Sequence, residues 1–78
     1  MKIYWAGGKK NIIGPKVRAL RKAHGLTQKG LARALQLKGY DFSDLTILRI
    51  EKGDRFVPDY EIKQLASFFN VPYADLLD

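Results

Sequence analysis

The chain has 78 residues, of which 46% are hydrophobic and 28% are charged, a balance typical of one small folded domain. The lack of cysteine in the sequence excludes disulfide bonds, thiolate metal sites and cysteine nucleophiles. The formal net charge of +6 at pH 7 predicts a polyanionic partner or an anionic surface.

The positive charge is concentrated in the first half of the chain. Residues 1–40 contain ten Lys or Arg and no Asp or Glu, whereas residues 41–78 contain four basic and eight acidic residues. The first part therefore carries a charge of +10 and the second a charge of −4. We expect the basic part to supply most contacts with an anionic partner.

Several functional classes do not fit the sequence. It contains no run of about 18 apolar residues, so no membrane span is predicted. The first residues form too short an apolar stretch for a signal peptide, and we therefore expect a cytoplasmic protein. His24 has no carboxylate near it in the sequence, and we interpret it as a helix-end residue. Without a nucleophile–base pair or a metal-ligand cluster, the sequence predicts no enzyme, cofactor, metal ion or small-molecule substrate.

Residues 1–12 are predicted to form a leader, distinct from a helical domain at 13–78. The leader joins the apolar segment Ile3-Tyr4-Trp5 to the flexible, basic segment Gly7-Gly8-Lys9-Lys10. Three interpretations stay open. The leader is a basic arm on the anionic partner, a strand that pairs with its copy in a dimer, or an ordered segment that covers the core with Trp5.

The first two helices are predicted at 15–24 and 27–38. Gly14-Pro15 suits a helix start because proline is favoured at the first helical position, and Gly25 suits the left-handed residue just after a helix. Thr27 is the predicted N-cap of the second helix. The apolar residues at helical spacing in these segments are Val17, Leu20, Leu31, Ala34 and Leu35.

Three further helices complete the predicted domain. Ser43 is the N-cap of a helix at 43–52, and Gly53 ends this helix. The fourth helix lies at 58–70, and Pro72 opens a short fifth helix. The inward-facing residues of the third and fourth helices are Ile47, Ile50, Ile62, Leu65, Ala66 and Phe69. The sequence therefore predicts an all-α, compact five-helix bundle.

Two motifs in this helical arrangement indicate a family. Leu26-Thr27-Gln28, followed by Leu31-Ala32, precedes a second motif, Arg49-Ile50-Glu51-Lys52-Gly53. This combination resembles the phage Cro/repressor-type (XRE-type) helix–turn–helix DNA-binding domains, and the resemblance runs from about Val17 to Leu77. It implies a lambda-repressor-like fold in which helix 43–52 reads the major groove of double-stranded DNA.

The resemblance implies a base-contacting set on helix 43–52. Arg49 suits guanine because its guanidinium can bond O6 and N7 together. Asp44 either accepts from cytosine N4 or only caps the helix, and both interpretations stay open. Leu45 and Leu48 either touch a thymine methyl or pack on the domain or a partner chain. The complete set is Asp44, Leu45, Leu48 and Arg49.

The resemblance also implies a phosphate-contacting set. Gln28 would donate to a phosphate at the start of the second helix. An ion pair between Arg21 and Glu51 would hold Arg21 near the phosphates, and would add little stability if exposed. Tyr40 either donates its hydroxyl to the DNA backbone or packs on the second helix. For Lys52 and Arg55, the alternative is that they are ordinary solvated surface residues. The complete set comprises Thr27, Gln28, Arg21, Lys38, Tyr40, Ser43, Lys52 and Arg55.

The turn between the second and third helices is longer than the family pattern. Aligning the two motifs with that pattern leaves about five extra residues, roughly Leu37 to Asp41. We interpret them as a longer second helix and a wider turn, which cost little closure entropy.

The function that follows from the resemblance is a sequence-specific DNA-binding transcriptional regulator, with repressor as the preferred role. It would be bacterial or phage-encoded and would bind a palindromic site as a homodimer. In the interpretation of the leader as a basic arm, it would follow the DNA backbone or enter a minor groove. The alternative hypothesis is a protein-interaction module of the same fold, such as an antitoxin of a toxin–antitoxin pair.

Overall fold

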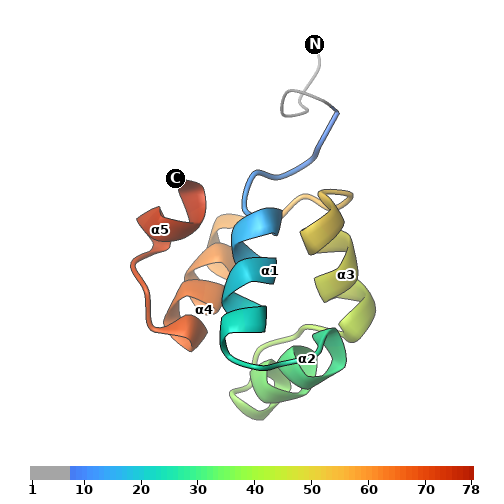
Figure 1. Ribbon diagram of the computed structural model, residues 1–78, viewed down its shortest axis with the longest axis vertical. Coiled ribbons are helices and arrows are strands. Elements are labelled where there is room, and N and C mark those ends of the chain that lie inside the picture. The colour runs from blue at the N-terminus through green and yellow to red at the C-terminus, as the bar shows by residue number, and fades with distance from the viewer. Residues whose placement is uncertain (1–7) are drawn as a thin grey trace.

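The computed structural model describes residues 8–78, so the predictions for Ile3, Tyr4 and Trp5 lie outside the described residues. The regular elements of this part are all α-helices, which confirms the predicted fold class. No helix of residues 8–78 is both long and apolar enough to cross a membrane. The helices are α1 (Gly14–Ala23), α2 (Gln28–Leu37), α3 (Asp44–Lys52), α4 (Asp59–Phe69) and α5 (Tyr73–Leu77) (Figure 1).

The helix ends lie within one or two residues of the predicted positions because the local capping signals operate as expected. The hydroxyl of Thr27 accepts from the Gly30 N–H at 2.9 Å, and that of Ser43 accepts from the Thr46 N–H at 3.1 Å. Gly53 at φ 80° and Asn70 at φ 57° end α3 and α4 in the left-handed conformation. His24 is the C-cap residue of α1, as predicted.

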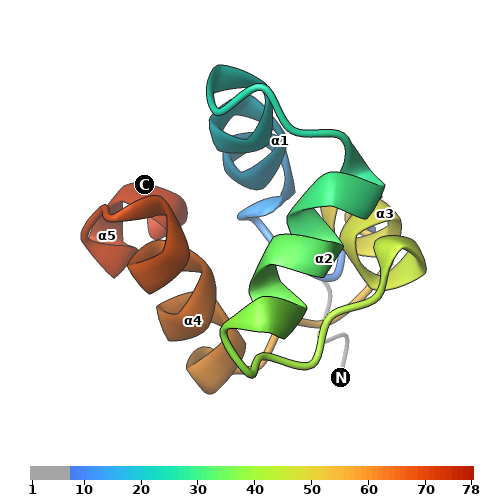
Figure 2. The same cartoon turned by 90° about the horizontal axis from the view of Figure 1, so that it is seen from below.

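The core lies where the helices converge around α3. This helix packs against both α1 and α2, while α5 packs on α4. Viewed from below, α2 and α3 lie together on one side and α4 and α5 on the other (Figure 2). The buried apolar residues are Ile13, Val17, Leu31, Ala32, Leu35, Phe42, Ile47, Ile50, Leu65, Ala66, Phe69 and Leu76. The predicted inward faces of helices two to four are therefore confirmed, with Ile62 only partly buried and Ala34 outside this buried set.

The connection between α2 and α3 holds the extra length predicted for the turn. Residues 38–43 form it, and α2 ends at Leu37, one residue before the predicted end. Phe42 is 1% exposed and anchors this connection in the core. The Gln36 side chain donates to the Phe42 carbonyl at 2.6 Å, and Tyr40 packs against the core in a half-buried position. The wide turn is thus an anchored connection that sets the direction of α3.

Candidate nucleic-acid interface

The outer face of α3 carries the residues predicted to contact bases. Ile47 and Ile50 point into the core, so the residues between and before them face outward. Leu45 is 48% exposed, Asp44 and Arg49 are exposed, and Leu48 is half-buried. All four predicted residues are therefore accessible to some degree on one side of the helix.

The start of α2 lies beside this face. A shallow hollow of about 340 Å³ is lined by Thr27, Gln28 and Lys29 from the start of α2. From α3, the residues that line it are Asp44, Leu45 and Leu48. The structure thus brings residues of both predicted contact sets to one surface, where a helix N-terminus offers free N–H groups to an anion.

Arg49 differs from Arg21 and Arg55 in its contacts. Its guanidinium makes no hydrogen bond or ion pair with any residue between 8 and 78, whereas Arg21 and Arg55 each bind a carboxylate. The forked donor group of Arg49 is therefore available for a bidentate contact.

Asp44 takes part in the N-terminal cap of α3. Its carboxylate accepts from the Leu45 N–H at 3.0 Å, next to the capping hydroxyl of Ser43. A negative charge at this position is stabilised by the positive end of the helix dipole. The capping interpretation of Asp44 thus has an observed bond, although the side chain stays exposed.

Arg21 is mostly buried and binds the carboxylate that was predicted as its partner. The predicted ion pair exists: Nε and Nη2 donate to the two carboxylate oxygens of Glu51 at 2.7 and 3.0 Å. Nη1 donates to the Leu26 carbonyl at 2.8 Å, and the residue is only 8% exposed. The hydrogen bonds to Glu51 raise the pKa of Arg21 above its ordinary value. All three side-chain nitrogens of Arg21 are engaged within the domain, and its predicted phosphate contact stays a prediction.

Gln28 is held by the same carboxylate. Its side-chain amide donates to Glu51 at 3.2 Å, and the residue is half-buried. One donor of this amide is therefore oriented by the ion pair, which fixes Gln28 at the start of α2. The pair between α1 and α3 thus positions a residue of the predicted phosphate set.

Arg55, another residue of the predicted phosphate set, also binds a carboxylate within the domain. Its guanidinium binds both carboxylate oxygens of Glu61 in α4, at 2.5 and 3.0 Å, and the side chain is 32% exposed. The hydrogen bond to Glu61 raises the pKa of Arg55. Arg55 therefore joins the loop after α3 to the start of α4 and is not a free cation.

The remaining predicted phosphate contacts lie at several places. Thr27 and Ser43 cap α2 and α3 with their hydroxyls, and both residues are exposed. Lys52 is exposed at the last turn of α3. Lys38 is exposed at the end of α2 opposite to Thr27. Tyr40 is half-buried against the core, and its predicted contact stays a prediction.

The profile of a helix–turn–helix domain family matches residues 12–78. The chain belongs to this helix–turn–helix family. The resemblance to the Cro/repressor type and the predicted fold class are therefore confirmed. No curated protein matched the chain.

Solved structures of helix–turn–helix proteins resemble the whole domain. The DNA-binding domain of BldD is 27% identical with a TM-score of 0.75, covering 95% of this chain and all of that one. The S. venezulae BldD DNA-binding domain is 28% identical with a TM-score of 0.73, covering 90% and 97%. The restriction–modification controller protein C.AhdI from Aeromonas hydrophila is 33% identical with a TM-score of 0.67, covering 82% and 89%.

One set of contacts was not predicted from the sequence: residues 9–11 of the leader bind the end of α3 and the loop after it. Lys9 Nζ donates to the Lys52 carbonyl at 2.8 Å, and the Lys10 N–H donates to the Gly53 carbonyl at 2.8 Å. The Asn11 amide donates to the carbonyls of Ile50 and Arg55 at 3.2 and 2.8 Å.

Asn11 also serves the start of α1. Its side-chain oxygen accepts from the Gly14 N–H at 2.9 Å. A Cβ on Gly14 would lie 2.5 Å from the Ile50 carbonyl oxygen, so this close approach of α1 to α3 requires glycine. The available sequence signal was an asparagine shortly before the helix, since asparagine side chains often accept from backbone N–H groups a few residues further on.

Proposed function

We propose that this helix–turn–helix domain is a sequence-specific DNA-binding regulator of transcription that acts as a repressor. The observation that supports it best is the single surface formed by the start of α2 and the outer face of α3. Arg49 lies on this face, and its guanidinium has no bonded partner among residues 8–78. The similar structures of BldD and C.AhdI are a DNA-binding domain and a controller protein, which agrees with this role. Because no residue between 8 and 78 binds the Arg49 guanidinium, we favour DNA as the partner over the interaction-module alternative.

In the proposed complex α3 lies in the major groove and α2 starts at the sugar–phosphate backbone. Arg49 bonds O6 and N7 of a guanine, and Leu45, Leu48 and Asp44 face the neighbouring bases. Gln28 and the N–H groups at the start of α2 bind a phosphate. The further phosphate contacts are Thr27, Lys38, Ser43 and Lys52.

Residues 13–78 are the proposed DNA-binding unit, and two copies act together. A single module of this size buries only about 600–1,000 Å² on DNA. Two half-sites about 34 Å apart, one turn of the duplex, provide the affinity that one module lacks. A palindromic site follows because a two-fold protein dimer presents the same surface twice.

The test is enrichment of random duplexes by the purified protein, followed by titration of the enriched duplex and a scrambled duplex. Arg49→Ala should reduce the difference between the two affinities by about 1–3 kcal/mol, since one bidentate base contact is lost. Lys63→Ala is the matched control because Lys63 is exposed on α4, away from the α2–α3 surface. Equal binding of both duplexes by the unaltered protein would refute sequence-specific regulation.

A further inference from the structure

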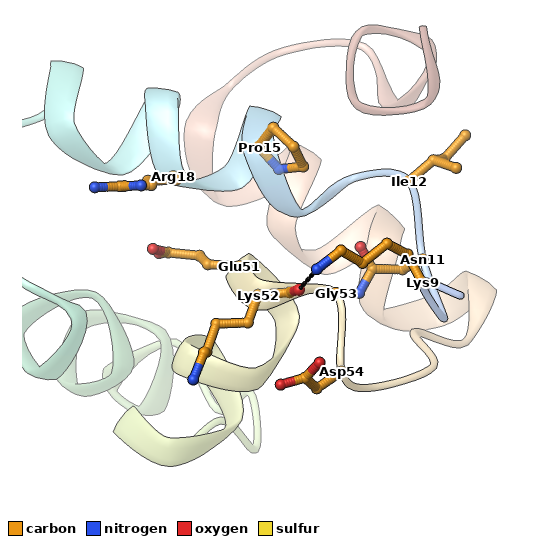
Figure 3. A pocket seen from close by; sticks show the side chains of 9 residues that line it. All are labelled: Lys9, Asn11, Ile12, Pro15, Arg18, Glu51, Lys52, Gly53 and Asp54. Atoms are coloured by element: carbon orange, nitrogen blue, oxygen red, sulfur yellow. Dashed lines mark hydrogen bonds between the residues drawn. The ribbon is translucent and has the colours of Figure 1, made fainter. Parts of the chain in front are cut away.

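A second hollow lies where the leader, α1 and the end of α3 meet. It measures about 420 Å³ and opens to solvent (Figure 3). Its lining residues are Lys9, Asn11, Ile12, Pro15, Arg18, Glu51, Lys52, Gly53 and Asp54. None of the predicted contacts on α1 or the leader accounts for it, since Arg21 points into the interior instead.

The lining carries three cations from three separate segments. Lys9 belongs to the leader, Arg18 to α1 and Lys52 to α3. The bond from Lys9 Nζ to the Lys52 carbonyl holds the first of these ammonium groups at the rim. Figure 3 shows Arg18 extending from α1 above Glu51 and the Lys52 side chain extending below it.

The two acidic residues of the hollow have different surroundings. Glu51 is bound by the guanidinium of Arg21, so its charge is balanced within the domain. Asp54 makes no ion pair with any basic residue in the described part of the chain. With Glu51 balanced, the cations outnumber Asp54 three to one, and the hollow therefore attracts an anion.

The hollow continues the proposed DNA-binding face. Lys52 comes three residues after Arg49 and four after Leu48, and residues at these spacings are neighbours on one side of a helix. A duplex that receives α3 in its major groove therefore brings a backbone strand toward this end of the helix.

We infer that this hollow binds a phosphate of the DNA backbone, with Arg18 and Lys52 as its main ligands and Lys9 as a third cation. The inference rests on the proposed function and adds Arg18 and Lys9 to the contact set. It gives the domain phosphate contacts at both ends of the α2–α3 surface, which would fix the angle of α3 in the groove.

The experiment measures the salt dependence of the dissociation constant on the enriched and the scrambled duplex. Each neutralised phosphate contributes about 0.9 to the slope of log affinity against log salt. Arg18→Gln should therefore lower that slope by about 1 and weaken binding to both duplexes equally. Asp54→Asn should strengthen binding to both duplexes, because it removes the unbalanced negative charge.

Lys16→Gln is the control. Lys16 is on the same helix and loses the same charge, but it lines a different groove, between α1 and α5. The inference is overturned if the salt slope is unchanged in Arg18→Gln, or if it changes as much in Lys16→Gln as in Arg18→Gln. The proposed function is judged separately, by whether the unaltered protein prefers the enriched duplex. If the unaltered protein binds no duplex, the proposed function fails and the inference fails with it.

Discussion

The two ends of α3 have contrasting environments. At the C-terminal end, the leader binds the carbonyls of Ile50, Lys52 and Gly53, and Arg21 binds Glu51. At the N-terminal end, Ser43 and Asp44 only cap their own helix. From Asp44 to Arg49, no side chain is hydrogen-bonded to another element in the described part of the chain.

This difference suits a helix that must read another molecule. In the proposed complex, the side chains that meet the bases need free donors and acceptors, because a group bound within the domain has fewer of them left for a base edge. The direction of such a helix must nevertheless be fixed, since a displacement of about 1 Å misaligns bidentate contacts. Here the buried Phe42 before α3 and the bonds at the C-terminal end of α3 fix the helix, while the side chains of Asp44, Leu45 and Arg49 stay accessible.

The largest test of this contrast is Glu51→Ala. It leaves the guanidinium of Arg21 buried without its carboxylate partner, and such losses cost about 3–5 kcal/mol. Domains of this length have a total unfolding free energy of about 4–12 kcal/mol. We therefore expect urea denaturation to show a domain that is largely unfolded or close to it.

Two variants serve as controls for Glu51→Ala. Arg21→Met with Glu51→Leu removes both charges together and should recover most of the loss, because no buried charge is left unpaired. Glu61→Ala breaks the other pair, whose arginine is 32% exposed, and should cost less since water can solvate Arg55. A loss from Glu51→Ala no larger than that from Glu61→Ala would contradict a structural role for the interior pair.

The helices and their caps could be predicted because those signals are local. Thr27, Ser43, Gly53 and Asn70 act on backbone groups within a few residues, so each is readable from the chain alone. The family motifs in turn predicted which residues lie on the outer face of α3. The anchoring of Phe42 in the core was not predicted, since it depends on how α2 and α3 pack.

The contacts that were not predicted all join groups that only the folding of the chain brings together. A free arginine and a paired one look the same in a sequence. Arg21 lies 30 residues from Glu51, and Asn11 lies 39 residues from Ile50. The exposure of Arg21 and the leader's bonds thus depend on the packing of α1 against α3. Arg55 and Glu61 are only six residues apart, but their contact requires the loop before α4 to turn back.

A smaller effect is expected from Asn11→Ala, which tests the leader's share in fixing α3. The change removes two donated bonds and one accepted bond, and we expect a loss of about 2 kcal/mol in the free energy of unfolding. Gln36→Ala is the comparison, because it removes a single side-chain bond to the Phe42 carbonyl. Equal losses in urea denaturation would show that the leader contributes little to the position of α3.

The smallest effect on stability is expected from Leu45→Ala, on the accessible end of α3. Leu45 is 48% exposed, so its truncation should change the free energy of unfolding by less than about 0.5 kcal/mol. Binding should respond more strongly if this side chain faces a thymine methyl. Replacing thymines of the enriched duplex one at a time by deoxyuridine removes only that methyl, and one replacement should weaken binding about fourfold.

The same replacement of thymine by deoxyuridine should not change the affinity of the Leu45→Ala variant, because this variant already lacks the apolar partner of the methyl group. Leu37→Ala is the matched control: Leu37 is 85% exposed at the end of α2, and this variant should keep the response to deoxyuridine. If Leu45→Ala still responds to deoxyuridine as the unaltered protein does, another residue reads the methyl. If Leu45→Ala lowers the free energy of unfolding as much as Asn11→Ala does, the N-terminal end of α3 contributes as much to stability as the C-terminal end. The contrast between the two ends then fails.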